Sequence, residues 1–215
     1  MREFVNRWTF TCTLLGAGLA LLILSLELSA KTIPFCRFSL QDGWTDEEPS
    51  EYITRKARRD DESGVPQVVR KIKRALSISA DFDVYIAEHE DNAFATVANG
   101  RKLLIVDVGF LEKLNQIART QWSAIQVISH EIGHHIAGFS EDRHRAELNA
   151  DYWSGQTLQR LGSSRSAATS GILAFGTEFD LPSHPNKRRR AAAIVKGWDD
   201  ARKGVIDYSF CDDCR

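Results

Sequence analysis

The sequence lacks an excess of charge of either sign, because its 215 residues include 28 lysines and arginines against 29 aspartates and glutamates. The resulting net charge of −1 gives no reason to expect nucleic acid or an acidic surface as a partner. A basic cluster, Lys187-Arg188-Arg189-Arg190, is short and lies in a predicted helix, where a solvated face is the usual role of such residues. We therefore expect no nucleic acid partner.

Cysteine is also scarce, with four residues in the chain, and Cys12 lies inside an apolar segment. The motif Cys211-x-x-Cys214 cannot complete a four-cysteine zinc site alone, and its surroundings do not resemble a thioredoxin-like unit. The alternatives are a local disulfide, a bridge from Cys36 to one member of the pair, or a redox or metal site. We favour the bridge from Cys36, which would tie the C-terminal tail, residues 204–215, to an N-terminal stem.

Residues 1–30 combine early arginines with a long apolar run from Leu14 to Leu26. This pattern indicates a signal peptide or an uncleaved transmembrane anchor, and Leu28-Ser29-Ala30 is a candidate cleavage site. Because arginines tend to stay in the cytoplasm, either reading exports the chain from residue 31 onward. We expect a periplasmic protein, or one anchored in the inner membrane with its catalytic domain outside the cytoplasm. Uncleaved, the segment would make the membrane a partner.

The sequence His130-Glu131-x-x-His134 proposes a metal site. On an α-helix, residues four apart lie on one face, so the two imidazoles can share one zinc ion. Glu131 lies about 100° further round the helix, from where it can act as general base toward a water on the metal. Apolar residues at positions 122, 125, 128, 132 and 136 extend helical periodicity through the motif. Gly133 would allow another segment to approach closely, and His135 points away from the metal face.

A catalytic zinc site needs a third protein ligand. A second predicted helix, from Asp142 to Leu161, carries Glu147 and Asp151 one turn apart on one face. Glu147 would complete the ligand set, and Asp151 would hold a ligand histidine through its other ring nitrogen. The alternatives are an exposed acidic face, or His144 as the third ligand, which we rank second.

Four separated motifs resemble the gluzincin zinc metallopeptidases related to HtpX and the CAAX prenyl protease. They occur in that family's order, and they are Asn92-Ala93-Phe94-Ala95, His130-Glu131-x-x-His134, Glu147-x-x-Ala150-Asp151 and Ser183-His184-Pro185 followed by Arg190. Only twelve residues separate His134 from Glu147, so the chain resembles a compact version of the catalytic domain.

The resemblance implies a role for each matched residue. His130, His134 and Glu147 would bind one zinc ion, Glu131 would be the general base, and Asp151 would orient a ligand histidine. His184 would help to stabilise the oxyanion, a role that lowers the barrier to peptide hydrolysis, and Arg190 would brace that region. The segment Asn92 to Ala95, with Thr96 and Val97, would be a sheet edge that takes an extended substrate as an added strand.

Local patterns predict an α+β fold of the zincin-like type, in which a small antiparallel sheet packs on the zinc helix beside further helices, after one N-terminal apolar helix. Strands are expected at 81–86, 93–97 and 103–106, with a hairpin turn at Asn99-Gly100. Helices are expected at 66–76, 108–115, 163–175 and 187–195, with a further short helix near 51–59. We divide the chain into the N-terminal segment 1–30, a polar stem 31–65, a metallopeptidase domain 66–203 and the tail 204–215.

The predicted function is that of a zinc-dependent endopeptidase acting on protein or peptide substrates outside the cytoplasm or at the membrane surface. The alternative is a catalytically inactive, membrane-associated binding or chaperone-like module that keeps the fold. Retention of Glu131 argues against that alternative, because a purely structural zinc site has no use for a general base.

Overall fold

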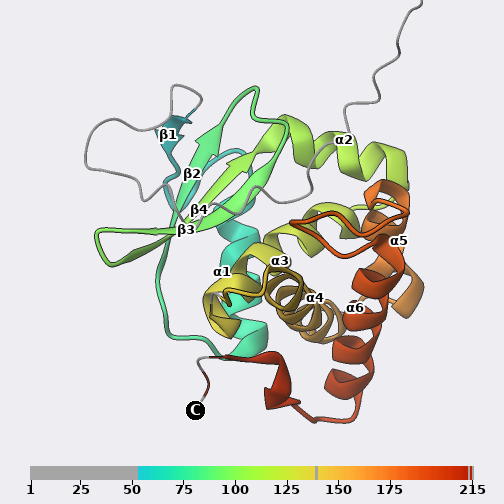
Figure 1. The fold of residues 1–215 in the computed structure, drawn as a ribbon. Coiled ribbons are helices and arrows are strands. Elements are labelled where there is room, and N and C mark those ends of the chain that lie inside the picture. Colours follow the sequence, from blue (N-terminus) through green and yellow to red (C-terminus); the bar gives the residue numbers. More distant parts are fainter. Residues whose placement is uncertain (1–52, 139, 213, 215) are drawn as a thin grey trace, which may run out of the picture. The chain divides into compact units, whose positions relative to one another are not determined.

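The computed structural model describes residues 53–138, 140–212 and 214. Predictions that concern residues 1–52, including the apolar N-terminal segment and the surroundings of Cys36, lie outside the described residues. The described part is an α+β fold with a four-stranded mixed sheet and six α-helices (Figure 1). Within this part of the chain, none of the helices combines the length and apolar character needed to cross a bilayer.

The sheet has the strand order β1-β2-β4-β3. Its strands are β1 (Ile53–Lys56), β2 (Phe82–Ala87), β3 (Ala93–Ala98) and β4 (Arg101–Asp107). The hairpin predicted at Asn99-Gly100 is confirmed, because β3 and β4 pair antiparallel from Ala98 opposite Arg101. The prediction of an antiparallel sheet is wrong, because β2 and β4 run parallel.

Asp107 connects the loop after β2 to the end of β4 and the start of α2 (Val108–Ala118). Its carboxylate accepts hydrogen bonds from the backbone N–H groups of Glu90 and Asp91 at 3.0 and 3.1 Å, and from that of Phe110 at 3.2 Å. One side chain therefore fixes the loop after β2, the end of β4 and the start of the next helix. The strand order β1-β2-β4-β3 puts β4, and not β3, beside β2. Hydrophobic alternation identifies strands but carries no information on this order.

The second difference is at the N-terminal end of the described chain. The short helix expected near residues 51–59 is instead strand β1, which pairs antiparallel with β2 through Arg55 opposite Ile86. The sheet thus extends N-terminal to residue 66, where we expected the domain to begin. Backbone pairing with β2 satisfies polar groups that a short isolated helix would leave to water.

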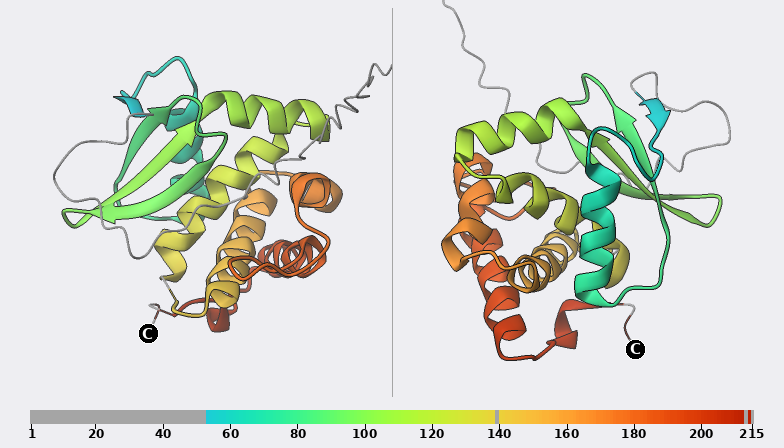
Figure 2. Two further views of the ribbon diagram at one scale, coloured as in Figure 1. Left: turned by 45° about the horizontal axis from the view of Figure 1, so that its top comes forward. Right: turned by 180° about the vertical axis from the view of Figure 1, so that it is seen from behind.

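One face of the sheet is covered by helices α1 (Val65–Leu76) and α3 (Trp122–Ala137), as Figure 2 shows. Alternate strand residues point to this face because the side-chain period of a strand is two. The buried apolar residues that meet there are Val84 and Ile86 of β2, Leu104 and Val106 of β4, Ala93 and Ala95 of β3, and Val69, Ile72, Ile128 and Ile132 of the helices. This core fixes α3 against the sheet.

The remaining helices form layers behind α3. They are α2 (Val108–Ala118), α4 (Arg143–Arg160), α5 (Arg165–Phe175) and α6 (Lys187–Arg202), so each helix predicted between residues 66 and 202 is present. Helix α4 packs against α3, and α6 packs against the other side of α4, while α5 contacts both α3 and α6 (Figures 1 and 2). Three helices that are consecutive in space, α3, α4 and α6, therefore carry the motifs of the predicted site.

Helices α4 and α6 approach each other backbone to backbone. A Cβ atom on Gly155 would collide with the carbonyl oxygen of Ile194, and one on Gly197 would collide with the carbonyl oxygen of Tyr152. Each helix thus contributes a glycine at the point where the other helix passes. This close contact sets the distance between the side chains that the two helices direct toward each other.

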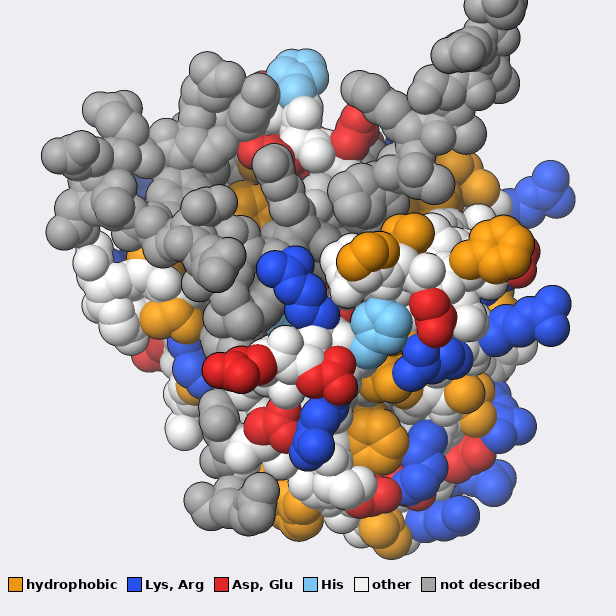
Figure 3. Space-filling view, viewed as in Figure 1, with side chains coloured by type: hydrophobic (Ala, Val, Ile, Leu, Met, Phe, Trp, Pro, Cys, Tyr) orange, Lys and Arg blue, Asp and Glu red, His pale blue; other side chains and the backbone are white. Residues whose placement is uncertain are grey.

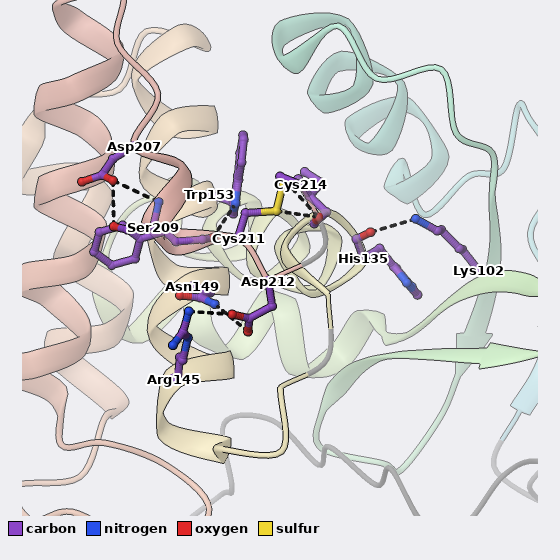
Figure 4. Close-up of a disulfide and its surroundings, with 12 residues drawn as sticks. Lys102, His135, Arg145, Asn149, Trp153, Asp207, Ser209, Cys211, Asp212 and Cys214 are labelled. Atoms are coloured by element: carbon purple, nitrogen blue, oxygen red, sulfur yellow. Dashed lines mark hydrogen bonds and ion pairs between the residues drawn. A yellow bond between two sulfur atoms is a disulfide. The ribbon is translucent and has the colours of Figure 1, made fainter.

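The C-terminal tail packs on α3 and α4 (Figure 4). Phe210 lies at the end of the 3-10 helix Tyr208–Phe210, and its ring stacks on Tyr152 with 4.4 Å between the ring centroids. Asp212 forms an ion pair with Arg145 at 2.7 Å, and its backbone N–H donates to the carbonyl oxygen of Ala137 at 2.7 Å. The tail therefore connects the C-terminal end of α3 to the first turns of α4.

A disulfide joins Cys211 to Cys214 within this tail (Figure 4). The favoured bridge from Cys36 is thus wrong, since both of its possible partners are bonded to each other, and the local disulfide is the alternative that holds. The two Cα atoms are 5.5 Å apart, a separation that a disulfide spans without moving the backbone.

Charged side chains of both signs are interspersed on the face of the molecule shown in Figure 3. Acidic and basic side chains lie next to each other over much of this face. The surface thus agrees with the balanced composition.

We predict that Gly197→Ala destabilises the protein by about 1–3 kcal/mol, because the added methyl group forces α6 away from the backbone of α4. Urea unfolding followed by circular dichroism measures the change. Lys203→Ala, an exposed substitution just beyond the same helix, is the control and should leave the unfolding midpoint unchanged. Equal midpoints for the two variants would show that the close contact does not contribute to stability.

Candidate metal centre

Helix α3 presents both motif histidines from one face toward α4. His130 and His134 are buried, and the ring of one lies edge-on to the other with centroids 4.7 Å apart. Between them, a Cβ atom on Gly133 would lie 2.7 Å from the carbonyl oxygen of Ala150 on α4. The close approach that the sequence predicted at Gly133 is therefore present, and it brings the ligand-bearing face of α4 onto the histidines.

His130, His134 and Glu147 form a buried cluster that could hold a metal ion, with one ligand atom from each residue within 4.8 Å of the others. A carboxylate oxygen of Glu147 lies 3.3 Å from Nε2 of His130, and the other lies 3.5 Å from Nε2 of His134. These are the three residues that the sequence proposed as ligands, drawn from two helices.

The donor set fits zinc. Two imidazole nitrogens and one carboxylate oxygen are a combination found in catalytic zinc sites, which keep a further position open. All three side chains are at least 98% buried. The carboxylate of Glu147 therefore contacts the two imidazoles and the charged groups around it instead of water. A carboxylate that is removed from water in this way is stabilised by a cation. The cluster is thus compatible with a catalytic zinc site.

Asp151 lies directly behind His130. Its carboxylate oxygen is 2.9 Å from Nδ1 of His130, so the ring can donate that hydrogen and turn Nε2 toward Glu147. Asp151 follows Glu147 by one helical turn, which is why both carboxylates face the same histidine. A carboxylate at this position fixes the orientation and tautomer of a ligand histidine.

Arg190 connects α6 to this cluster. Its Nε atom is 2.7 Å from one carboxylate oxygen of Asp151, and its Nη2 atom is 3.0 Å from the other. The same Nη2 atom is 3.2 Å from a carboxylate oxygen of Glu147 and 3.3 Å from the ring of His130. Arg190 is 99% buried, so its guanidinium is a cation shared by two carboxylates in the protein interior.

The surroundings keep both carboxylates ionised. Burial raises the pKa of each, but the charge of Arg190 and the hydrogen bonds with His130 outweigh it, so the pKa of Glu147 lies well below its usual value and that of Asp151 is also lowered. Ionised carboxylates are what a metal site requires.

The same charges act on the histidine between them. Burial lowers the pKa of His130, but Asp151 and the hydrogen bond with Glu147 raise it more strongly, to about 9. A metal ion binds the neutral ring, so metal binding at neutral pH would release this proton.

His184 lies at the edge of the cluster, in the loop before α6. Its Nε2 atom is 3.7 Å from a carboxylate oxygen of Glu147 and has no hydrogen-bond partner among the described residues. Its Nδ1 atom is 2.7 Å from the hydroxyl oxygen of Ser183. Burial lowers the pKa of His184, which favours the neutral ring. The sequence analysis assigned no role to Ser183, although its position next to His184 could have indicated a hydrogen bond between the two side chains.

Glu131, His135 and His144 lie in three different surroundings. Glu131 is buried on α3, between His130 and His134 in the sequence. His135 is directed away from the cluster, with Nε2 2.9 Å from the carbonyl oxygen of Leu103 on β4. His144, the rival third ligand, is partly exposed and lies outside the ligand cluster.

The predicted substrate-binding segment lies at the edge of the sheet. Ala93, Phe94 and Ala95 belong to β3, which is the outermost of the described strands on the side of β4, and β3 packs against α3. Asn92 is buried just before the strand, and its carbonyl oxygen accepts a hydrogen bond from the backbone of Asp107. This arrangement places an edge strand beside the helix that carries the histidines.

Comparisons with known proteins add no assignment, because the chain matches no family model, no curated protein and no solved structure.

We predict that Arg190→Met destabilises the metal-free protein by about 3–5 kcal/mol, because it leaves two buried carboxylates without their shared cation. The measurement is urea unfolding in the presence of a chelator. Arg188→Met removes an exposed arginine from the same helical turn and is the matched control. A loss of stability no larger than in the control would show that Arg190 does not compensate these charges.

Proposed function

We propose that this protein is a zinc-dependent endopeptidase. The observation that carries the proposal is the buried cluster of His130, His134 and Glu147 on adjacent helices, with the acidic residue Glu131 next to a ligand histidine. A structural zinc site has four protein ligands and no need for a neighbouring carboxylate, whereas a catalytic site has three and uses one. The ordered motifs that resemble gluzincin metallopeptidases support the same proposal.

His130, His134 and Glu147 would hold the zinc ion, which when bound supplies a Lewis acid for the peptide carbonyl and a more acidic water. Glu131 would accept the proton of the attacking water and transfer it to the amine of the leaving group. Asp151 and Arg190 would keep the ligand residues in place, since they hold His130 and Glu147 from behind. In this mechanism the ionised carboxylate of Glu147 would be a zinc ligand, and the carboxylate of Glu131 would be the general base.

His184 would stabilise the developing oxyanion. When the hydroxyl of Ser183 donates to Nδ1, the neutral ring carries its hydrogen on Nε2, which is directed toward the cluster. A hydrogen-bond donor that meets negative charge formed in the transition state lowers the barrier. The lowered pKa of His184 supports this use of a neutral ring.

We further propose that the protein acts on protein or peptide substrates outside the cytoplasm or at the membrane surface. The N-terminal segment, in which two arginines precede a long apolar run, supports export. The disulfide between Cys211 and Cys214 supports it as well, because such bonds persist in oxidising compartments. The edge strand β3 would pair with an extended peptide beside α3.

We expect the purified full-length protein to contain about one zinc ion per chain, and Glu147→Gln to lose most of it because a neutral amide is a poor ligand in place of a carboxylate. Metal analysis after dialysis against a weak chelator gives the stoichiometry. The matched control is Glu141→Gln, in the exposed segment just before α4. Full zinc content in Glu147→Gln would exclude it as a ligand.

We expect Glu131→Gln to bind zinc as the natural protein does but to cleave casein at least ~10²-fold more slowly, because it lacks the general base. Glu112→Gln, an exposed change on α2, should retain activity. Undiminished cleavage by Glu131→Gln would remove the mechanism. Zinc binding without cleavage of any unfolded substrate by the natural sequence would favour the non-catalytic module.

A further inference from the structure

His184 is held in a tight turn of the loop between α5 and α6. The backbone N–H of Leu181 donates to the carbonyl oxygen of His184 at 2.8 Å, and the N–H of His184 donates to the carbonyl oxygen of Leu181 at 3.2 Å. The backbones of Leu181 and His184 are therefore joined by two reciprocal hydrogen bonds. Any group that fixes Leu181 also fixes His184.

His144 is such a group. Its Nε2 atom lies 2.7 Å from the carbonyl oxygen of Leu181, the same oxygen that accepts from His184. His144 stands three residues before Glu147 on α4, so it lies within one turn of that predicted ligand. The contact thus connects the helix that carries Glu147 to the turn that carries His184.

Arg189 determines which nitrogen of His144 carries the hydrogen. The Nη1 atom of Arg189 is 3.3 Å from Nδ1 of His144 and 2.7 Å from a carboxylate oxygen of Asp180. Because a guanidinium has donors and no acceptor, Nδ1 must be the acceptor in this contact. The neutral ring then carries its hydrogen on Nε2 and donates it to Leu181.

Asp180 anchors the same loop at its other side. One carboxylate oxygen accepts hydrogen bonds from the backbone and side-chain nitrogens of Asn186, the N-cap residue of α6, at 2.7 and 2.8 Å. The other oxygen is paired with Arg189. Arg189 is thus oriented by Asp180 on one side while it meets His144 on the other.

We propose that His144, oriented by Arg189, is a positioning residue that holds His184 in place for oxyanion stabilisation. The inference rests on the proposed function, and it gives a role to a histidine that does not belong to the ligand cluster. His144 acts through the backbone of Leu181 and touches neither the metal ligands nor the reacting atoms. It fixes the distance between α4 and the loop, and so the position of His184 relative to Glu147.

The test compares two substitutions at one position in the full-length protein. His144→Leu removes the donor to Leu181, so kcat for a fluorogenic peptide should fall about tenfold or more while KM and zinc content stay unchanged. His144→Gln keeps an N–H donor at a similar reach and should restore most of kcat. His89→Leu, an exposed histidine after β2, is the control and should keep full activity.

A second pair of variants tests the orientation of the ring. Arg189→Met removes the contact to Nδ1 of His144 and should lower kcat, as His144→Leu does. Arg188→Met, its exposed neighbour, should not. Equal kcat values for Arg189→Met and Arg188→Met would overturn the role of Arg189 in orienting His144.

Amide hydrogen exchange separates failure of this inference from failure of the proposed function. Loosening of the turn in His144→Leu should speed exchange of the His184 amide severalfold, whether or not the protein cleaves peptides. Unchanged exchange would overturn the inference, as would faster exchange with an unchanged kcat, or an equal loss of kcat in His144→Leu and His144→Gln. If the natural sequence cleaves no peptide, the proposed function fails and the exchange rate alone decides whether His144 holds the turn.

Discussion

The cluster of His130, His134 and Glu147 depends on the buried ion pairs that Arg190 forms with two carboxylates. The guanidinium of Arg190 lies between the carboxylates of Asp151 and Glu147, and it brings α6 to the face of α4 that meets the histidines of α3. Two ionised carboxylates could not remain buried at this point without a cation, because desolvation would protonate them or drive them to the surface. With Arg190 in place, Glu147 stays ionised for a metal and Asp151 stays ionised for His130. The charge balance of the interior therefore keeps both carboxylates ionised beside a cluster that could hold a metal ion.

Close helix packing makes this charge arrangement possible. Glycine at position 133 allows α3 to meet the backbone of α4, and glycines at 155 and 197 allow α4 to meet α6. Side chains from three helices then reach one another over hydrogen-bond distances. The tail adds a further connection, because Asp212 bonds to the end of α3 and to α4 at once, next to the disulfide. The sheet supports the other side of α3 and offers β3 as an edge.

Local sequence patterns predicted the elements well but not their neighbours in space. The periodicity through residues 122–136 and the Asn99-Gly100 turn depend on residues close in the chain, and the corresponding helix and hairpin are present. The parallel pairing of β2 with β4 and the strand at residues 53–56 depend on distant partners, and both were missed. The disulfide was misjudged for a related reason, since the choice between Cys36 and a local partner depends on where the tail lies.

The sequence by itself determined the chemistry available to the site. Helical spacing places His130 and His134 on one face and Glu147 and Asp151 on another, because a turn of 3.6 residues is a local property of the backbone. Only the tertiary structure decided that these faces meet, and that Arg190 lies between the carboxylates. It also decided that His144, on α4, contacts the loop that carries His184 and lies outside the cluster of His130, His134 and Glu147. These outcomes depend on close packing between helices and on the cost of burying charge, and both arise only when segments distant in sequence come together.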